Sequence, residues 1–166
     1  MPKKTIMKLD AIDYKILKLL QEDSNRTVKS ISESLGLSTT PIFERIKKLE
    51  NENFIDNYVA VLNQNKIGLK QIVFIGITLQ GHTRSYLEKF VKEINDFPEV
   101  VECHRVSGNF DYLLKLVVKD IEAYEKFIIT KLTLIPYLGS VQSLITLSTN
   151  KQTNELDLSH LLEKTK

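Results

Sequence analysis

The chain has 166 residues, of which 42% are hydrophobic and 27% charged, and its formal net charge is +2. This composition is typical of a globular protein with one domain or two small ones, and it contains no run of the roughly 18–20 apolar residues that span a membrane. The small net charge does not indicate nucleic-acid binding by itself, so such a function depends on where the charges lie. A single cysteine, Cys103, excludes an internal disulfide and favours a reducing cytoplasm.

Three helices are expected in the first third of the chain, each introduced by a residue that can cap a helix N-terminus. Asp10 begins the first helix. Thr27 begins the second, which Gly36 ends by taking a left-handed conformation. Ser38 begins the third, and its hydroxyl is expected to accept a hydrogen bond from the first turn. Two short helices joined by a tight glycine turn, with a third before them, indicate a helix-turn-helix, although an ordinary three-helix bundle fits the spacing too.

The third of these helices has one side to bury and one side to expose. Ile42, Ile46 and Leu49 form its apolar stripe. The other side offers hydrogen-bonding and basic groups, which a helix in a DNA major groove requires. Residues near the start of the helix are placed to contact bases, and its cations are placed to contact phosphates. Phe43 can touch thymine methyl groups or pack against the first helix, with packing slightly favoured. The candidate DNA-binding residues are Arg26, Ser38, Thr39, Thr40, Phe43, Glu44, Arg45, Lys47 and Lys48.

A change of composition after the third helix suggests a domain boundary. Residues 54–62 are rich in β-forming side chains and predict an extended strand, and the polar stretch that follows contains Gly68. We therefore divide the chain into a DNA-binding domain with a linker strand (1–62), a second domain (63–150) and a tail (151–166). The leucines of the tail are consistent with a short amphipathic helix on a neighbour or with a frayed end.

The second domain has the element order βαββαβ. Strands are predicted at 71–79, 100–106, 111–118 and 141–148, with helices that follow Thr83 and Asp120. This order is typical of the ferredoxin-like split βαβ pattern, so the fold class is α+β, with a helix-turn-helix domain followed by a ferredoxin-like domain. Two helices on one face of such a sheet leave an apolar face that needs cover. We infer that a second chain covers it, which makes the protein at least a dimer.

The loop between the two middle strands is the best candidate for a ligand site. Gly108 frees backbone amides that can bind a carboxylate, and Asp111 offers a carboxylate for an ammonium group, so the loop suits an amino acid. A plain hairpin turn is the alternative. No catalytic set and no metal-ligand spacing stands out. The candidate effector-binding residues are Ser107, Gly108, Asn109, Phe110, Asp111, Tyr112, Gln142 and Thr146.

Two separate motifs resemble those of one family, the Lrp/AsnC transcription regulators. The first runs Leu9-Asp10-x-x-Asp13-x-x-Ile16-Leu17-x-x-Leu20, then Leu35-Gly36-Leu37-Ser38-x-x-Pro41-x-x-x-Arg45-Ile46-x-x-Leu49-Glu50, then Ile55-x-x-Tyr58. The second is the stretch Val106-Ser107-Gly108-Asn109-Phe110-Asp111-Tyr112. Asn53 and Asn109 depart from the pattern, since the family usually has glycine at the first position and often an acidic residue at the second.

The resemblance implies a function for each domain. It implies a winged helix-turn-helix that binds double-stranded DNA, and a βαββαβ domain that binds an amino-acid effector between dimers, near Gly108. It also implies dimers that assemble further, often into octamers. We therefore expect a cytoplasmic, sequence-specific transcription regulator that is not an enzyme and has no membrane partner, metal or cofactor besides the effector. A metabolite-binding βαββαβ protein with weak or lost specific DNA binding stays open as the alternative.

Overall fold

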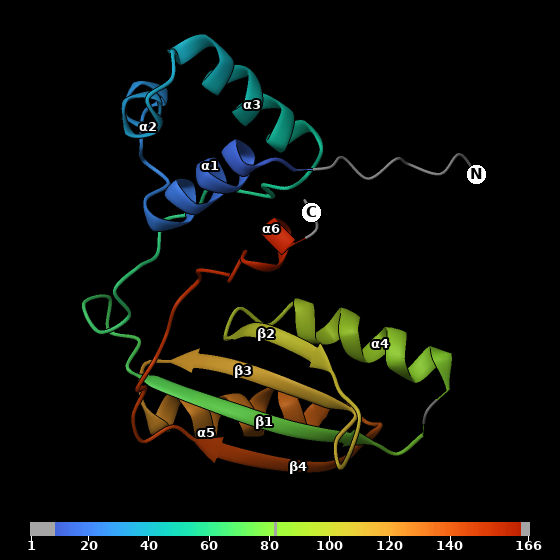
Figure 1. Ribbon diagram of the computed structural model, residues 1–166. Helices are drawn as coiled ribbons and strands as arrows, with labels where there is room; N and C mark the ends of the chain where they lie inside the picture. Colours follow the sequence, from blue (N-terminus) through green and yellow to red (C-terminus); the bar gives the residue numbers. More distant parts are fainter. Residues whose placement is uncertain (1–8, 82, 164–166) are drawn as a thin grey trace. The chain divides into compact units, whose positions relative to one another are not determined.

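The computed structural model describes residues 9–81 and 83–163 and divides into two compact units (Figure 1). The first unit contains the residues up to Val61 together with those from Lys151 onward, and the second is Leu62–Asn150. The N-terminal unit is therefore built from two separate stretches of sequence. No helix among the described residues is long and apolar enough to cross a membrane.

The first unit begins with the three expected helices. They are α1 (Ala11–Glu22), α2 (Val28–Leu35) and α3 (Thr39–Asn51). Asp10 caps α1 and Thr27 caps α2 through side-chain hydrogen bonds to first-turn amides. Gly36 ends α2 with φ 66°, and Asn53 follows α3 with φ 59°, both in the left-handed region. The prediction for Ser38 is wrong in one respect, because it occupies the N-cap position of α3 without a side-chain capping bond.

The three helices share one small core. Ile42, Ile46 and Leu49 of α3 are buried as their spacing predicts. They pack with Ile16, Leu17 and Ile31 of the two preceding helices in a single apolar cluster. Since burial of apolar surface is the main favourable contribution to such a fold, this cluster determines which side of α3 is left for other contacts.

The stretch after α3 does not form the predicted strand. Within the described part of the chain, no residue between α3 and Gln71 belongs to a strand. Val59 and Val61 are largely exposed, and none of the strand pairings among the described residues includes this segment. A strand needs a hydrogen-bonded partner, and side-chain propensity alone does not supply it. Gly68 takes φ 82° in a turn near the start of the second unit.

The tail packs on the N-terminal unit of its own chain. The amide of Gln21 on α1 is hydrogen bonded twice to the backbone of Leu156, with Leu156 N to Oε1 at 2.8 Å and Nε2 to Leu156 O at 3.2 Å. Leu158 packs against the helical core. A four-residue helix, α6 (His160–Glu163), follows. The tail is therefore part of the helical unit, rather than a frayed end.

The second unit has the predicted βαββαβ order, and the predicted fold class is confirmed. Its elements are β1 (Gln71–Leu79), α4 (Arg84–Asn95), β2 (Val100–Arg105), β3 (Tyr112–Val118), α5 (Ile121–Thr130), the 3₁₀ turn η1 (Leu132–Leu134) and β4 (Leu138–Ile145). The sheet has the order β2-β3-β1-β4, with antiparallel neighbours. The last strand begins three residues earlier than predicted, because Gly139 lies within it instead of ending the turn before it.

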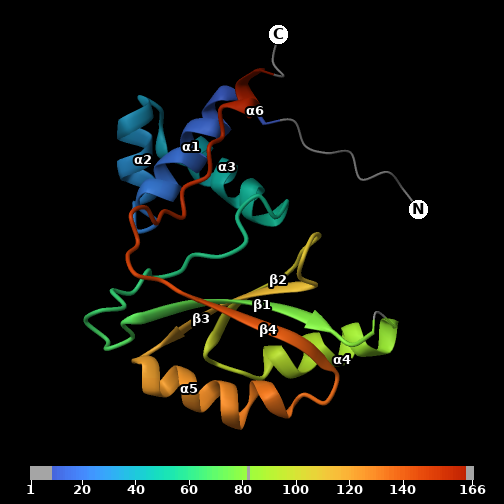
Figure 2. The same ribbon diagram turned by 90° about the horizontal axis from the view of Figure 1, so that it is seen from below.

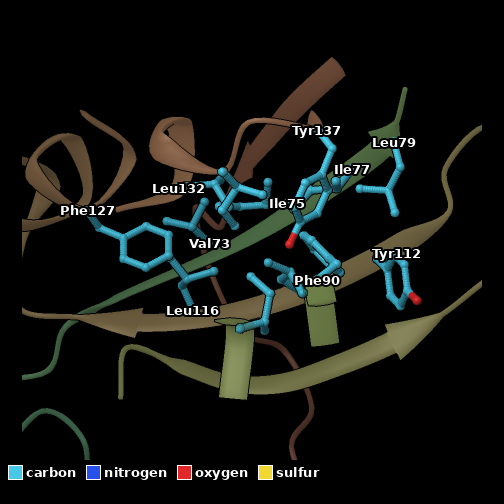
Figure 3. Close-up of a cluster of buried hydrophobic side chains, with 13 residues drawn as sticks. Val73, Ile75, Ile77, Leu79, Phe90, Tyr112, Leu116, Phe127, Leu132 and Tyr137 are labelled. Atoms are coloured by element: carbon cyan, nitrogen blue, oxygen red, sulfur yellow. The ribbon is translucent and has the colours of Figure 1, made fainter. Parts of the chain in front are cut away.

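Both long helices of this unit cover one face of the sheet (Figure 2). Alternate residues of β1, including Val73, Ile75 and Ile77, point into the core that these helices close (Figure 3). Phe90 of α4 and Phe127 of α5 are fully buried in the same cluster. On β1 and β3, the residues that alternate with these core-facing residues lie on the opposite face of the sheet. We call this face the open face of the sheet.

Candidate functional site

The side of α3 away from the core is exposed along its length. Thr39, Thr40 and Glu44 are exposed, as predicted for residues that meet base edges. Phe43 is 50% exposed, so the slightly favoured packing against the first helix is wrong. The first turns of α3 therefore present two hydroxyls, one carboxylate and one aromatic ring to the surroundings. Such a set can read both hydrogen-bonding groups and thymine methyl groups in a major groove.

The two lysines of α3 differ in their ion pairing. Lys47 Nζ lies 2.7 Å from Glu50 Oε2 and 5.9 Å from the centre of the Phe43 ring. Lys47 is the main cause of a lowered pKa at Glu50. Tyr58, from the segment after α3, donates to the other oxygen of Glu50 at 3.1 Å. Lys48 is exposed, and no ion pair with it is seen in the described part of the chain. Lys48 is therefore the cation of α3 most available to a phosphate.

Arg45 is paired with two carboxylates of its own chain, so its charge is less available to a phosphate than that of Lys48. Its Nη1 atom lies 2.7 Å from Asp10 Oδ2 and 2.6 Å from Asp13 Oδ1. Burial acts to raise the pKa of Asp10, but hydrogen bonds from the Asp13 amide and from Arg45 outweigh it and leave that pKa below its usual value. The two carboxylates in turn raise the pKa of Arg45. This cation already has two anionic partners from α1.

Arg26 is also less available than predicted. Its guanidinium lies 3.6 Å from Glu22 on α1, and its side chain is only 28% exposed. Its Nε is buried and without an acceptor among the described residues. The ion pair and the partial burial make Arg26 less available to a phosphate than the exposed Lys48. Ser38, by contrast, is exposed and its hydroxyl is free of a capping bond, which leaves it able to bind outside the protein.

The loop between β2 and β3 is held to the sheet by hydrogen bonds at both of its ends. The Val106 amide donates to Asp111 O at 3.0 Å, and the Asp111 amide donates to Ile77 O at 2.8 Å. The carboxylate of Asp111 accepts from the Leu79 amide at 2.8 Å. Gly108 has φ 120°, which a residue with a side chain rarely adopts. The Asp111 carboxylate therefore helps to hold the loop on β1, whether or not it also contacts an ammonium group. The exposed top of the loop is Ser107-Gly108-Asn109.

Phe110 and Gln142 meet at Gly76, a residue that the sequence analysis did not select. A Cβ on Gly76 would lie 2.7 Å from the Phe110 ring, so the ring rests on the glycine backbone. In the sheet, Gly76 pairs with Gln142 of β4. Paired residues of antiparallel strands point to the same face, which places Gln142 beside this contact on the open face. A glycine within a β-branched run signals such a close approach, and it could have been used to find this contact.

Two of the predicted effector residues are not brought to the loop. Tyr112 is 3% exposed and belongs to the core beneath the sheet, where its ring lies 4.6 Å from that of Phe90 (Figure 3). Burial also raises the pKa of Tyr112. Thr146 pairs with Ile72, at the other end of β1. Four residues of extended strand, about 13 Å, therefore separate Thr146 from Gln142.

Two hydroxyl side chains near the loop were missed by the sequence analysis. Thr78, two residues after Gly76 on β1, lies 2.9 Å from Ser140 of β4, oxygen to oxygen, and also accepts from the Ser140 amide at 2.7 Å. Neither residue is part of a motif, and only the strand register brings them together. The candidate effector end of the sheet, defined by Thr78, Ser140, Gln142 and the loop 107–111, offers hydroxyls, a side-chain amide and the backbone amides of the exposed loop top at 107–109.

Cys103 and His104 lie on opposite sides of β2, as strand alternation predicts. Cys103 packs against the core, where burial raises the pKa of its thiol. His104 is exposed and lies 3.2 Å from Glu102. Among residues 9–81 and 83–163, no cluster of three or more histidine, cysteine or acidic side chains could hold a metal ion.

Comparison with known proteins identifies the family. Residues 9–56 match the model for winged helix-turn-helix DNA-binding domains, and residues 72–156 match the Lrp/AsnC ligand-binding domain. The chain is 38% identical to the leucine-responsive regulatory protein of Escherichia coli over 148 residues, which cover 89% of this chain and 90% of that protein.

Solved structures agree with the sequence matches. An AsnC-family transcriptional regulator from Agrobacterium tumefaciens matches with a TM-score of 0.87 and 39% identity, over 92% of this chain and 99% of that one. A transcriptional regulator from Neisseria meningitidis, solved as a complex with L-Met, matches with a TM-score of 0.89 and 32% identity over the same shares. The chain therefore belongs to the Lrp/AsnC family of transcriptional regulators.

Proposed function

We propose that the protein is an oligomeric, non-catalytic transcription regulator in the cytoplasm that binds double-stranded DNA by sequence and responds to an amino acid. The exposed side of α3 carries the DNA-binding part of this proposal. Thr39, Thr40, Phe43 and Glu44 read bases, while Lys48, assisted by Lys47 and the Ser38 hydroxyl, contacts phosphates. The apolar stripe of α3 holds these residues outward because it is buried in the helical core.

The DNA-binding part is tested by selecting duplexes from a random pool with the full-length chain. We expect an enriched sequence, with Thr40→Ala changing the preferred base at one position and Lys48→Ala weakening all duplexes alike. Removal of one phosphate contact lowers the slope of log affinity against log salt concentration by about one. If no sequence is enriched, the protein is instead a metabolite-binding member of the family with lost specific DNA binding.

The effector part of the proposal places an amino acid at the effector end of the sheet. Its carboxylate is bound by the loop amides around Gly108, and its side chain and ammonium group lie near Thr78, Ser140 and Gln142. The L-Met complex of the Neisseria relative supports an amino acid as the class of ligand. This end of the sheet is open in one chain, which is consistent with a site completed between dimers, and an octamer of four dimers is the assembly that we propose.

A thermal-shift screen against the twenty amino acids tests the effector. Gln142→Ala is the informative variant because Gln142 is exposed, whereas Asp111→Ala would also break the bond to the Leu79 amide. We expect one amino acid or a small class to stabilise the wild type and to lose its effect in Gln142→Ala. Thr146→Ala serves as the matched control and retains the shift. An unchanged shift in Gln142→Ala would place the ligand elsewhere.

A further inference from the structure

One guanidinium joins the start of α1 to the middle of α3. Arg45 Nη1 contacts both Asp10 Oδ2 and Asp13 Oδ1. The same two carboxylates form the capping box of α1, because Asp10 Oδ1 accepts from the amides of Ile12 and Asp13, and Asp13 Oδ2 accepts from the Asp10 amide at 3.1 Å. Helix capping and the contact between the helices therefore form a single hydrogen-bonded network.

The burial of Asp13 and the charges of this network constrain the orientation of α3. Asp13 is only 4% exposed, and a buried carboxylate is strongly unfavourable without a cation. The apolar stripe of α3 decides which side of the helix faces the core, but hydrophobic contacts have no direction and do not by themselves fix the exact angle of the helix about its axis. Charge-assisted hydrogen bonds do have direction, so the two bonds from Arg45 restrict the rotation of α3 about its own axis.

The surroundings of Arg45 are unfavourable for a phosphate. Arg45 lines a hollow of about 400 Å³ with Pro41, Lys48 and three carboxylates, those of Asp10, Asp13 and Glu44. Three negative groups against two positive ones repel a DNA backbone at this place. Lys48 lies at the same hollow and, being exposed, can turn its ammonium outward.

We infer that Asp10, Asp13 and Arg45 are positioning residues that set the angle at which α3 presents Thr39, Thr40 and Phe43 to DNA. Arg45 acts through the two aspartates and makes no phosphate contact. This inference rests on the proposed function, because it takes α3 as the helix that reads DNA.

The test compares Asp13→Asn, Arg45→Met and Arg45→Lys with Lys48→Met as the matched control on the same helix. Each full-length variant is titrated, over a range of salt concentrations, with a duplex selected by the wild type and with a duplex of random sequence. Amide hydrogen exchange of α3 is measured without DNA. We expect Asp13→Asn and Arg45→Met to weaken binding to the selected duplex by about tenfold or more, comparable to one lost base contact.

The salt slope and the exchange rate separate the two roles of Arg45. Positioning predicts a wild-type salt slope and faster exchange in α3 for both variants, whereas Lys48→Met lowers the slope by about one and leaves exchange unchanged. The inference is overturned if Arg45→Met lowers the slope by about one while Asp13→Asn binds and exchanges like the wild type.

Two further outcomes remain decisive. If Arg45→Met or Asp13→Asn does not fold, Arg45→Lys decides, because it keeps the charge but lacks the guanidinium fork. If Arg45→Lys binds the selected duplex more weakly and its α3 amides exchange faster, the positioning role is supported. If Arg45→Lys binds and exchanges like the wild type, the positioning role is overturned. If the wild type selects no sequence, the proposed function fails, and α3 exchange in Asp13→Asn or Arg45→Lys alone then supports or overturns the positioning role.

Discussion

Gly76 and Phe110 illustrate how one missing side chain shapes the candidate effector end of the sheet. The Phe110 ring occupies the space that a Cβ on Gly76 would need. The ring in turn fixes where the loop 107–111 leaves the sheet. At the scale of single residues, the position of the loop thus depends on a glycine in a strand as much as on the glycine in the loop itself.

Gly76→Ala is expected to displace the Phe110 ring and the loop that carries it. Overpacking of this kind costs about 1–3 kcal/mol of unfolding free energy, and we expect the amino-acid thermal shift to weaken with it. Urea denaturation provides the measurement. Phe110→Ala removes the ring, so the double variant should lose less stability than the sum of the single variants. If the losses of the two single variants simply add in the double variant, Gly76 and Phe110 are not coupled.

Asp10 makes the free energy of unfolding of the helical unit fall at acidic pH. Its pKa is lowered in the folded state, so its contribution is fully present above the unfolded value, about 3.9, and is lost as the pH falls through the lower folded value. Asp10→Ser keeps a capping hydroxyl without a titrating group. Urea unfolding between neutral pH and about pH 2.5 should therefore show a weaker loss of stability in Asp10→Ser. Equal pH dependence in both proteins would contradict this.

The contacts that the sequence does not predict join residues far apart along the chain or depend on a strand register. Arg45 meets Asp13, which is 32 positions away, and only the packing of α3 on α1 brings them together. Tyr112 lies in a loop motif, yet it is the first residue of β3 and alternates with Leu113. The exposed residues of α3 were predictable because one periodic stripe determines both of its sides.

Elements bounded by clear local signals were predicted well. The run that forms β1 is bounded by polar residues, and Gly36 and Asn53 supply the left-handed conformations that end helices. β4 was misplaced because Gly139 looks like a turn residue. In the structure it lies in the strand, where a Cβ would be 2.7 Å from Thr78 Oγ1, so it permits a close approach of β4 to β1.

The tail is an element whose packing the sequence left open, and its removal should weaken the helical unit. Truncation after Asn150 removes the two Gln21–Leu156 bonds and the Leu158 contact. We expect a loss of about 1–3 kcal/mol, measured by denaturation of the helical unit. Gln21→Ala should lose part of this in the full chain and nothing further in the truncated one. A truncated protein as stable as the wild type would show that these contacts are dispensable.

At the scale of the whole molecule, the open face of the sheet is the surface that a second copy would cover. Leu144 of β4 pairs with Phe74 and is 51% exposed on that face. The other face already carries α4 and α5, with Ile129 of α5 exposed on the outside. Apolar surface on the sheet itself favours assembly there, because association would bury it.

Leu144→Glu is therefore expected to shift the protein toward monomers, since a carboxylate would be buried without a partner in the covered face. Ile129→Glu is the matched control on the outside of α5 and should remain at least dimeric. Light scattering coupled to size-exclusion chromatography measures both masses. Monomers from Ile129→Glu but not from Leu144→Glu would move the interface to the helical face.

The return of the tail to the helical unit also sets the order in which a growing chain can finish its two units. The helices α1, α2 and α3 are synthesised first, but Leu156 and Leu158 leave the ribosome only after the whole βαββαβ unit. The ferredoxin-like unit can therefore complete its core while the DNA-binding unit still lacks its last contacts. The part of the protein that is made first is thus the part that is completed last, so a chain released early would combine a finished sheet with an unfinished DNA-binding unit.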